Sequence, residues 1–206
     1  MDHELMNLFA VPVYKSSLGR KYEQVETDYF RKELRDPVPT IYNHFSRNNN
    51  ILDVDAMKNI RTFIQQNLDN YFSTVYNTSN KVTLEITQSW LSVTGRGEAH
   101  HTHAHPNSFA SGVLYINLAK KDGINFYRNE ESKTFELLPK EENYYNAYTY
   151  SVEAQIGDIL IFPSTLKHGV NEVTDDIERV SLSFNTFLSG ELGRDSFYNG
   201  LRIKVN

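Results

Sequence analysis

Four strand-like runs in the second half of the chain constrain its fold most. They span residues 81–86, 112–118, 157–162 and 179–185. In three of them apolar and polar residues alternate, as in strands with one buried face, whereas 157–162 is more continuously apolar, as in a strand covered on both faces. Turns rich in Gly, Asn and Asp separate them. Short strands of this kind predict an antiparallel sandwich or jelly roll, that is, a mainly β fold.

The first 80 residues have a mixed and partly helical pattern. Residues 8–16 predict a short strand at a sheet edge, because Pro12 cannot donate a ladder hydrogen bond. Residues 21–35 carry a helical spacing of apolar positions, and a second helix is predicted to begin at Asp53 or Asp55, either of which can cap it. Its apolar stripe consists of Met57, Ile60, Ile64, Leu68, Tyr71 and Val75.

The whole chain, residues 1–206, is interpreted as one domain, because it contains no linker or internal repeat. We expect residues 1–80 to contribute a strand and helices that pack on a β core formed by residues 81–206. The last residues, 201–206, suit a final strand within the fold or at a dimer edge, so an oligomer stays open.

Composition narrows the class of protein. The absence of cysteine excludes disulfides and thiolate metal sites and fits a reducing compartment. The sequence starts without a signal-peptide pattern and has no apolar run of membrane-spanning length, so we expect a soluble, cytoplasmic protein with no membrane partner. A net charge of −5 makes nucleic acid an unfavourable partner.

Four of the seven histidines lie in the eight residues HHTHAHPN, at positions 100, 101, 103 and 105. In an extended chain His103 and His105 point to one side, with His101 in register and His100 out of register. Pro106 keeps His105 extended or turning. Two imidazoles on one strand face favour metal binding, whereas the bland alternative is a histidine-rich solvated loop.

Further polar residues that could form a site lie on or directly after the later predicted strands. His168 follows the apolar strand, and Arg179 and Ser181 share one face of an alternating strand. Arginine suits a carboxylate because its planar fork donates two parallel hydrogen bonds. Tyr115 and Asn117 likewise share a strand face. Each feature alone also fits an ordinary structural role, but their combination predicts a metal site beside an anion site.

This order of motifs resembles the non-haem Fe(II)- and 2-oxoglutarate-dependent dioxygenases. It is most similar to a branch of bacteria and phages with an HPNS…SGVYY-like segment. The resemblance covers residues 90 to 187, and the matching residues are 103–108, 111–115, 157–158, 162–164, 168–170 and 179–185.

The resemblance implies a double-stranded β-helix, a cupin-like jelly roll, that binds Fe(II) and 2-oxoglutarate. It implies His103 and His168 as metal ligands and Arg179 with Ser181 as the clamp for the far carboxylate of 2-oxoglutarate. Tyr115 and Asn117 are expected to bind 2-oxoglutarate or a metal-bound species. Such enzymes consume O2 and 2-oxoglutarate, release succinate and CO2, and hydroxylate a substrate, for instance a protein side chain such as proline.

The chain departs from the family at position 105, where the family has Asp or Glu. His105 as the third ligand would give an all-histidine site, which is the interpretation that we favour. Alternatively, a water or anion takes the place of a third ligand, or the pair is His101 and His103, or a carboxylate such as Glu98 or Asp158 takes part.

Two other functions remain open on the sequence. A three-histidine, cupin-like metal oxygenase would not use 2-oxoglutarate and would leave Arg179 for a salt bridge. A non-catalytic jelly-roll binding module would hold no stoichiometric metal. The tyrosine-rich segment 142–150 and the polar segment 127–133 suit either a lid or a surface hairpin.

Overall fold

The computed structural model describes residues 3–128 and 138–205, so most of the polar segment 127–133 lies outside the described residues. Two α-helices are present in this part of the chain, α1 (Gln24–Glu33) and α2 (Lys58–Tyr76), with short 3-10 turns at Ile51–Asp53, Asp55–Met57 and Asp195–Phe197. The strands are β1 (Tyr14–Ser17), β2 (Val38–Pro39), β3 (His44–Phe45), β4 (Val82–Thr94), β5 (His100–His103), β6 (Ala110–Asn117), β7 (Gly123–Tyr127), β8 (Thr149–Glu153), β9 (Asp158–Pro163), β10 (His168–Val170), β11 (Arg179–Leu192) and β12 (Leu201–Ile203).

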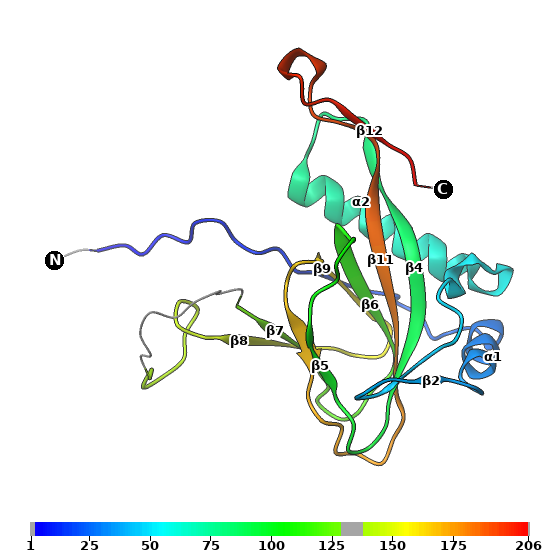
Figure 1. The fold of residues 1–206 in the computed structure, drawn as a ribbon. Helices are drawn as coiled ribbons and strands as arrows, with labels where there is room; N and C mark the ends of the chain where they lie inside the picture. Colours follow the sequence, from blue (N-terminus) through cyan, green and yellow to red (C-terminus); the bar gives the residue numbers. More distant parts are fainter. Residues whose placement is uncertain (1–2, 129–137, 206) are drawn as a thin grey trace.

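The described strands form two antiparallel sheets, as in a jelly roll. The major sheet has the order β1-β9-β6-β11-β4-β3-β2, with β12 added to the end of β11, and the minor sheet has the order β5-β10-β7-β8. Figure 1 shows the long pair β4 and β11 crossing the molecule, with β7 and β8 on the side away from α1. The mainly β, double-stranded β-helix fold expected from the sequence is therefore confirmed. None of the described helices is long and apolar enough to cross a membrane.

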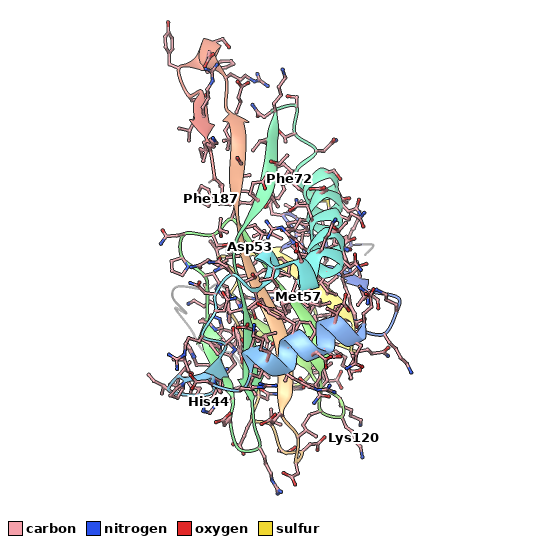
Figure 2. The ribbon with its side chains drawn as sticks, turned by 90° about the vertical axis from the view of Figure 1, so that its right-hand side faces the viewer. His44, Asp53, Met57, Phe72, Lys120 and Phe187 are labelled. Carbon is pink, nitrogen blue, oxygen red and sulfur yellow. The ribbon has the colours of Figure 1, made fainter. Side chains whose placement is uncertain are left out.

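Strand alternation divides the core into two clusters. One face of the major sheet, with Leu91, Leu114 and Leu182, packs against the helix layer. Met57 and Phe72, near the two ends of α2, mark this layer in Figure 2. The opposite face carries Tyr115 and Phe162 toward the minor sheet, where the second cluster forms. The polar residues of the alternating strands share that second face, so they lie between the sheets instead of in water.

Three local expectations for the N-terminal part need correction. Residues 8–13 form no strand, and β1 starts at Tyr14, although it does lie at the edge of the major sheet as predicted. Neither Asp53 nor Asp55 caps α2: both lie in 3-10 turns, and Asp53 is paired with Arg61. Val75 does not belong to the buried stripe, because it lies in the exposed last turn of α2 and 36% of this residue is exposed.

Gly112 marks a close approach between strands and gives a stability prediction. A Cβ there would lie 2.2 Å from Cζ of the buried Phe184 ring and 2.8 Å from the Leu160 carbonyl oxygen. Gly112→Ala should therefore lower the free energy of unfolding by about 1–3 kcal/mol in urea titrations. Gly95→Ala is the matched control, because its nearest neighbour would be 3.6 Å away in the Glu98 side chain. Equal unfolding midpoints for the two variants would contradict the prediction.

Candidate active site

Three histidines from two segments of the chain converge between the sheets. His103 and His168 are direct register partners in the β5–β10 ladder, and their ring centroids lie 4.4 Å apart. His105 follows β5 in a turn, where its backbone N–H donates to the Ser164 carbonyl at 2.9 Å. One ring nitrogen of each of the three histidines lies within 4.8 Å of the others. This group can hold a metal ion.

The hydrogen bonds of two rings set their tautomers for metal binding. Nδ1 of His103 donates to the His101 carbonyl at 2.8 Å, and Nδ1 of His168 donates to the Leu166 carbonyl at 2.9 Å. Each leaves Nε2 with a free lone pair. Nε2 of His105 lies 3.2 Å from Nε2 of His168. Nitrogens bound about 2.1 Å from one metal at right angles are roughly 3 Å apart, so this spacing fits two neighbouring ligand positions.

Burial keeps these imidazoles neutral. It lowers the pKa of His105 to about 4 and that of His168 to about 3, and it also lowers the pKa of His103. A neutral imidazole is the form that binds a metal. The site is thus ready for a cation at neutral pH without first losing protons.

The same pKa shifts predict acid sensitivity of the metal-free protein. In the unfolded chain histidine titrates near 6.5, so between about pH 6.5 and 4 the unfolded state binds protons that the folded state does not. The free energy of unfolding should therefore fall as pH is lowered through this window, by at most about 1.4 kcal/mol per pH unit for each shifted histidine. Urea titrations with a chelator at several pH values measure this slope. His168→Asn should flatten it, and an unchanged slope would contradict the prediction.

A second histidine group lies beside the first. His100, His101 and His103 also have ring nitrogens within 4.8 Å of one another, and the His100 and His103 rings stack at 4.6 Å. The expectation that His100 points away from the other histidines is therefore wrong. The β5–β10 ladder has a register shift between the His103–His168 and His100–Val170 pairs, so simple alternation does not hold along β5.

Serine hydroxyls fix the turn that carries His105. Ser164 Oγ donates to Ser108 Oγ at 2.7 Å, and Ser108 Oγ donates to the Thr186 carbonyl at 3.1 Å. Ser111 Oγ bonds Ser164 Oγ at 2.8 Å and donates to Asn185 Oδ1 at 2.9 Å. This network ties the turn to β6, β9 and β11. It gives Ser108 of the HPNS segment and Asn185 structural roles.

Arg179 lies buried on the face of β11 that is turned toward the minor sheet. Its Nε donates to both carboxylate oxygens of Asp122, at 3.0 and 2.9 Å, and Nη2 donates to the Gly123 carbonyl at 3.1 Å. Ser181 is buried in register between Ser92 of β4 and Tyr115 of β6. A salt bridge of Arg179 with Asp122 was not expected for a residue that clamps a carboxylate. Asp122 was missed because the sequence offers no pattern that links a loop residue to Arg179.

Unpaired polar atoms lie on the same face of the major sheet as Arg179. Among the described residues, four buried groups on this face of the sheet lack a hydrogen-bond partner: Trp90 Nε1, Ser92 Oγ, Thr94 Oγ1 and Tyr115 Oη. Leaving such groups unpaired is costly, so they suit a ligand that accepts hydrogen bonds. With the neutral histidines nearby, this donor set fits a metal and a dicarboxylate. The alternation in WLSVT was the available signal for Ser92 and Thr94.

Other predicted residues lie elsewhere. Asn117 is exposed, and its Nδ2 donates to the Glu178 carbonyl at 2.7 Å, because a register shift between β6 and β11 separates it from Tyr115. Asp158 pairs with Lys15 at 3.0 Å, and Glu98 accepts from the Gly95 N–H at 2.8 Å. The structure does not bring these three side chains to the histidine group formed by 103, 105 and 168.

A cavity of about 1140 Å³ lies at the β1 and β8 side of the two sheets. The extended arm of residues 6–11 and the tyrosine-rich segment line it, and Phe126 and Leu166 border it from inside. Both inner residues also contact His168: the Phe126 ring lies 6.3 Å from the imidazole, and Leu166 accepts its Nδ1–H. Figure 1 shows the arm running out over β7 and β8.

Comparison with known families agrees with this geometry. Residues 88–185 match the family model described as "Putative 2OG-Fe(II) oxygenase", in which 2OG is 2-oxoglutarate. The matched range includes all three converging histidines and Arg179. No curated protein matches the sequence.

Solved structures share the fold at low sequence identity. HygX from Streptomyces hygroscopicus with nickel and 2-oxoglutarate bound is 13% identical, with a TM-score of 0.58, over 85% of this chain and 82% of that one. A prolyl-4-hydroxylase from Pseudomonas putida is 13% identical, with a TM-score of 0.57, over 85% and 92%. SnoN, an alpha ketoglutarate dependent epimerase from nogalamycin biosynthesis, is 12% identical, with a TM-score of 0.60, over 86% and 78%.

Proposed function

We propose that this chain hydroxylates a protein side chain, such as that of proline, at a three-histidine Fe(II) centre, because residues 88–185 match the 2OG-Fe(II) oxygenase family model. His103, His105 and His168 are the proposed ligands. The observation that carries this assignment is the convergence of their ring nitrogens within 4.8 Å beside buried, unpaired hydroxyl groups. Fe(II) and 2-oxoglutarate supply the oxidation of substrate by O2, with succinate and CO2 as by-products.

The residues of the chain have distinct tasks in this proposal. The Leu166 and His101 carbonyls hold two imidazoles in the tautomer that offers Nε2. Arg179 and Tyr115 bind the far carboxylate of 2-oxoglutarate. Phe162, whose ring lies 4.7 Å from that of His168, excludes water from one side of the centre.

The cavity supports a polypeptide as the oxidised substrate. Its volume exceeds what a small ligand needs, and tyrosines offer large amphipathic contact surfaces at low entropic cost.

Tyr144 gives a test of this substrate class. It lines the cavity, its side chain is 64% exposed, and it is distant in sequence from the three histidines. Tyr144→Ala should raise the KM for a peptide substrate and leave 2-oxoglutarate binding unchanged. Succinate release and incorporation of one oxygen atom from labelled O2 into peptides, read by mass spectrometry, identify the substrate.

The first test is an anaerobic titration of the Fe(II)-loaded protein with 2-oxoglutarate, followed by the weak visible charge-transfer band of the chelate. A band that saturates at one equivalent supports the proposal. It should weaken in Arg179→Lys, which keeps a positive charge for Asp122 but loses the planar fork. Absence of the band with iron bound would reject 2-oxoglutarate as co-substrate.

One observation favours a second candidate function. Arg179 already forms a salt bridge with Asp122 at 2.9 Å, as a three-histidine oxygenase that does not use 2-oxoglutarate would allow. For that enzyme the visible spectrum of the iron centre would respond to the organic substrate and not to 2-oxoglutarate.

A further inference from the structure

The hydrogen bonds of Arg179 use only part of its guanidinium. The Asp122 carboxylate accepts a hydrogen bond from Nε–H, and the Gly123 carbonyl accepts one from Nη2–H. None of the hydrogen bonds of Arg179 within the described chain uses Nη1. The two charged side chains are 2% and 7% exposed. A guanidinium bound along its Nε side still has Nη1–H groups to offer to another acceptor.

Asp122 is itself fixed by the loop between β6 and β7. Its Oδ2 accepts the Ala119 N–H at 3.2 Å, and its Oδ1 accepts the Gly123 N–H at 2.5 Å. The carboxylate therefore keeps its orientation without help from solvent, and the guanidinium that it binds has one favoured position.

Two unpaired hydroxyls lie on residues next to Arg179. The Tyr115 ring centroid lies 5.5 Å from Cζ of Arg179, and Thr94 is the direct register partner of Arg179 across β4 and β11. Tyr115 Oη and Thr94 Oγ1 are buried without partners. Together with Nη1 these two hydroxyls form a set of hydrogen-bond donors that have no acceptor within the described chain.

Charge gives Asp122 a second effect. In the family one metal ligand is a carboxylate, whereas all three ligands proposed here are neutral histidines. With Fe(II), the 2-oxoglutarate dianion and Arg179, the loaded site would carry one uncompensated positive charge between the sheets. The Asp122 carboxylate cancels that charge, which reduces the cost of burying the loaded site.

On this basis, and resting on the proposed function, we propose that Asp122 is a positioning residue for the co-substrate. It fixes Arg179 so that Nη1, together with the hydroxyls of Tyr115 and Thr94, meets the far carboxylate of 2-oxoglutarate. Asp122 acts through Arg179 and does not itself touch the co-substrate, whereas Thr94 and Tyr115 do.

The test measures the dissociation constant of 2-oxoglutarate on Fe(II)-loaded protein, by anaerobic calorimetry and by the chelate band. Asp122→Asn should raise it by roughly 10-fold or more, because one oxygen of the acceptor pair becomes a donor facing Nε–H. Iron content should stay at one equivalent. Asp176→Asn, an exposed residue in the loop before β11, is the matched control and should bind like the wild type.

Thr94→Val separates ligand contact from structure. It removes a buried hydroxyl that has no partner, so the melting temperature of the ligand-free protein should stay the same or rise. Its affinity for 2-oxoglutarate should nevertheless fall. Unchanged 2-oxoglutarate affinity in the folded variants would overturn the inference.

Tighter binding in Asp122→Asn would overturn it in another way, because Asp122 would then compete with the co-substrate for Arg179. The wild-type titration reports on the proposed function separately. If wild-type protein binds iron but not 2-oxoglutarate, both proposals fail. If it binds both and Asp122→Asn matches it, only the positioning role fails.

Discussion

His168→Ala abolishes stoichiometric binding of Fe(II), with an expected loss of affinity of at least about 100-fold. Loss of a mere outer-shell partner already costs a metal site 10- to 100-fold, and this variant removes a direct ligand of the proposed centre. The position is buried between Phe126, Phe162 and the other two histidines, so no neighbouring side chain on that strand can replace the imidazole. Iron or cobalt content after gel filtration measures the effect.

The second histidine group supplies the control. His101→Ala removes an exposed side chain of the group formed by His100, His101 and His103, but it leaves the His101 carbonyl that orients His103. It should retain the metal. If His101→Ala loses the metal while His168→Ala keeps it, the centre is the second group and the assignment of His168 is refuted.

Position 105 offers a sharper variant of the same experiment. His105→Ala should also weaken metal binding, whereas His105→Asp restores the family carboxylate and should bind Fe(II) more tightly than wild type. Retention of full metal affinity in His105→Ala would instead leave His103 and His168 as a two-histidine site.

Strand alternation made much of this site predictable. The face shared by Arg179 and Ser181 followed from periodicity alone, and it does lie between the sheets. The sequence identified His103 and His168 as candidate metal ligands. Only the ladder that pairs them shows that they meet. Long-range pairing of this kind leaves no local signal in a single sequence.

Other features escaped prediction for identifiable reasons. The sequence pattern placed Asn117 on the same strand face as Tyr115. In the structure Asn117 lies outside the site, because a register shift near Val180 breaks the alternation. Asp122 lies in a loop, where no periodicity applies, and its importance comes from a contact 57 residues away. Asp53 was a reasonable cap by composition, but its pairing with Arg61 engages the carboxylate elsewhere.

Asp122→Ala and Arg179→Ala should each lower the free energy of unfolding by about 3–5 kcal/mol, because either one leaves a buried charge without its partner. Both side chains are at least 93% buried, so solvent cannot take over the lost interaction. Urea titrations of the metal-free proteins at pH 7 measure the loss. Exposed pairs such as Arg31 with Asp28 provide the contrast, since Asp28→Ala should cost less than about 1 kcal/mol.

The double variant separates the stability of this pair from its use. Replacing both residues with apolar side chains of similar volume, Arg179→Met with Asp122→Leu, removes both buried charges at once, so its stability should return to within about 1–2 kcal/mol of wild type. A double variant whose loss equals the sum of the two single losses would contradict a direct coupling. If the double variant folds, it should still bind Fe(II) through the histidines but no longer bind 2-oxoglutarate. Burying this ion pair would then serve the co-substrate and not the fold.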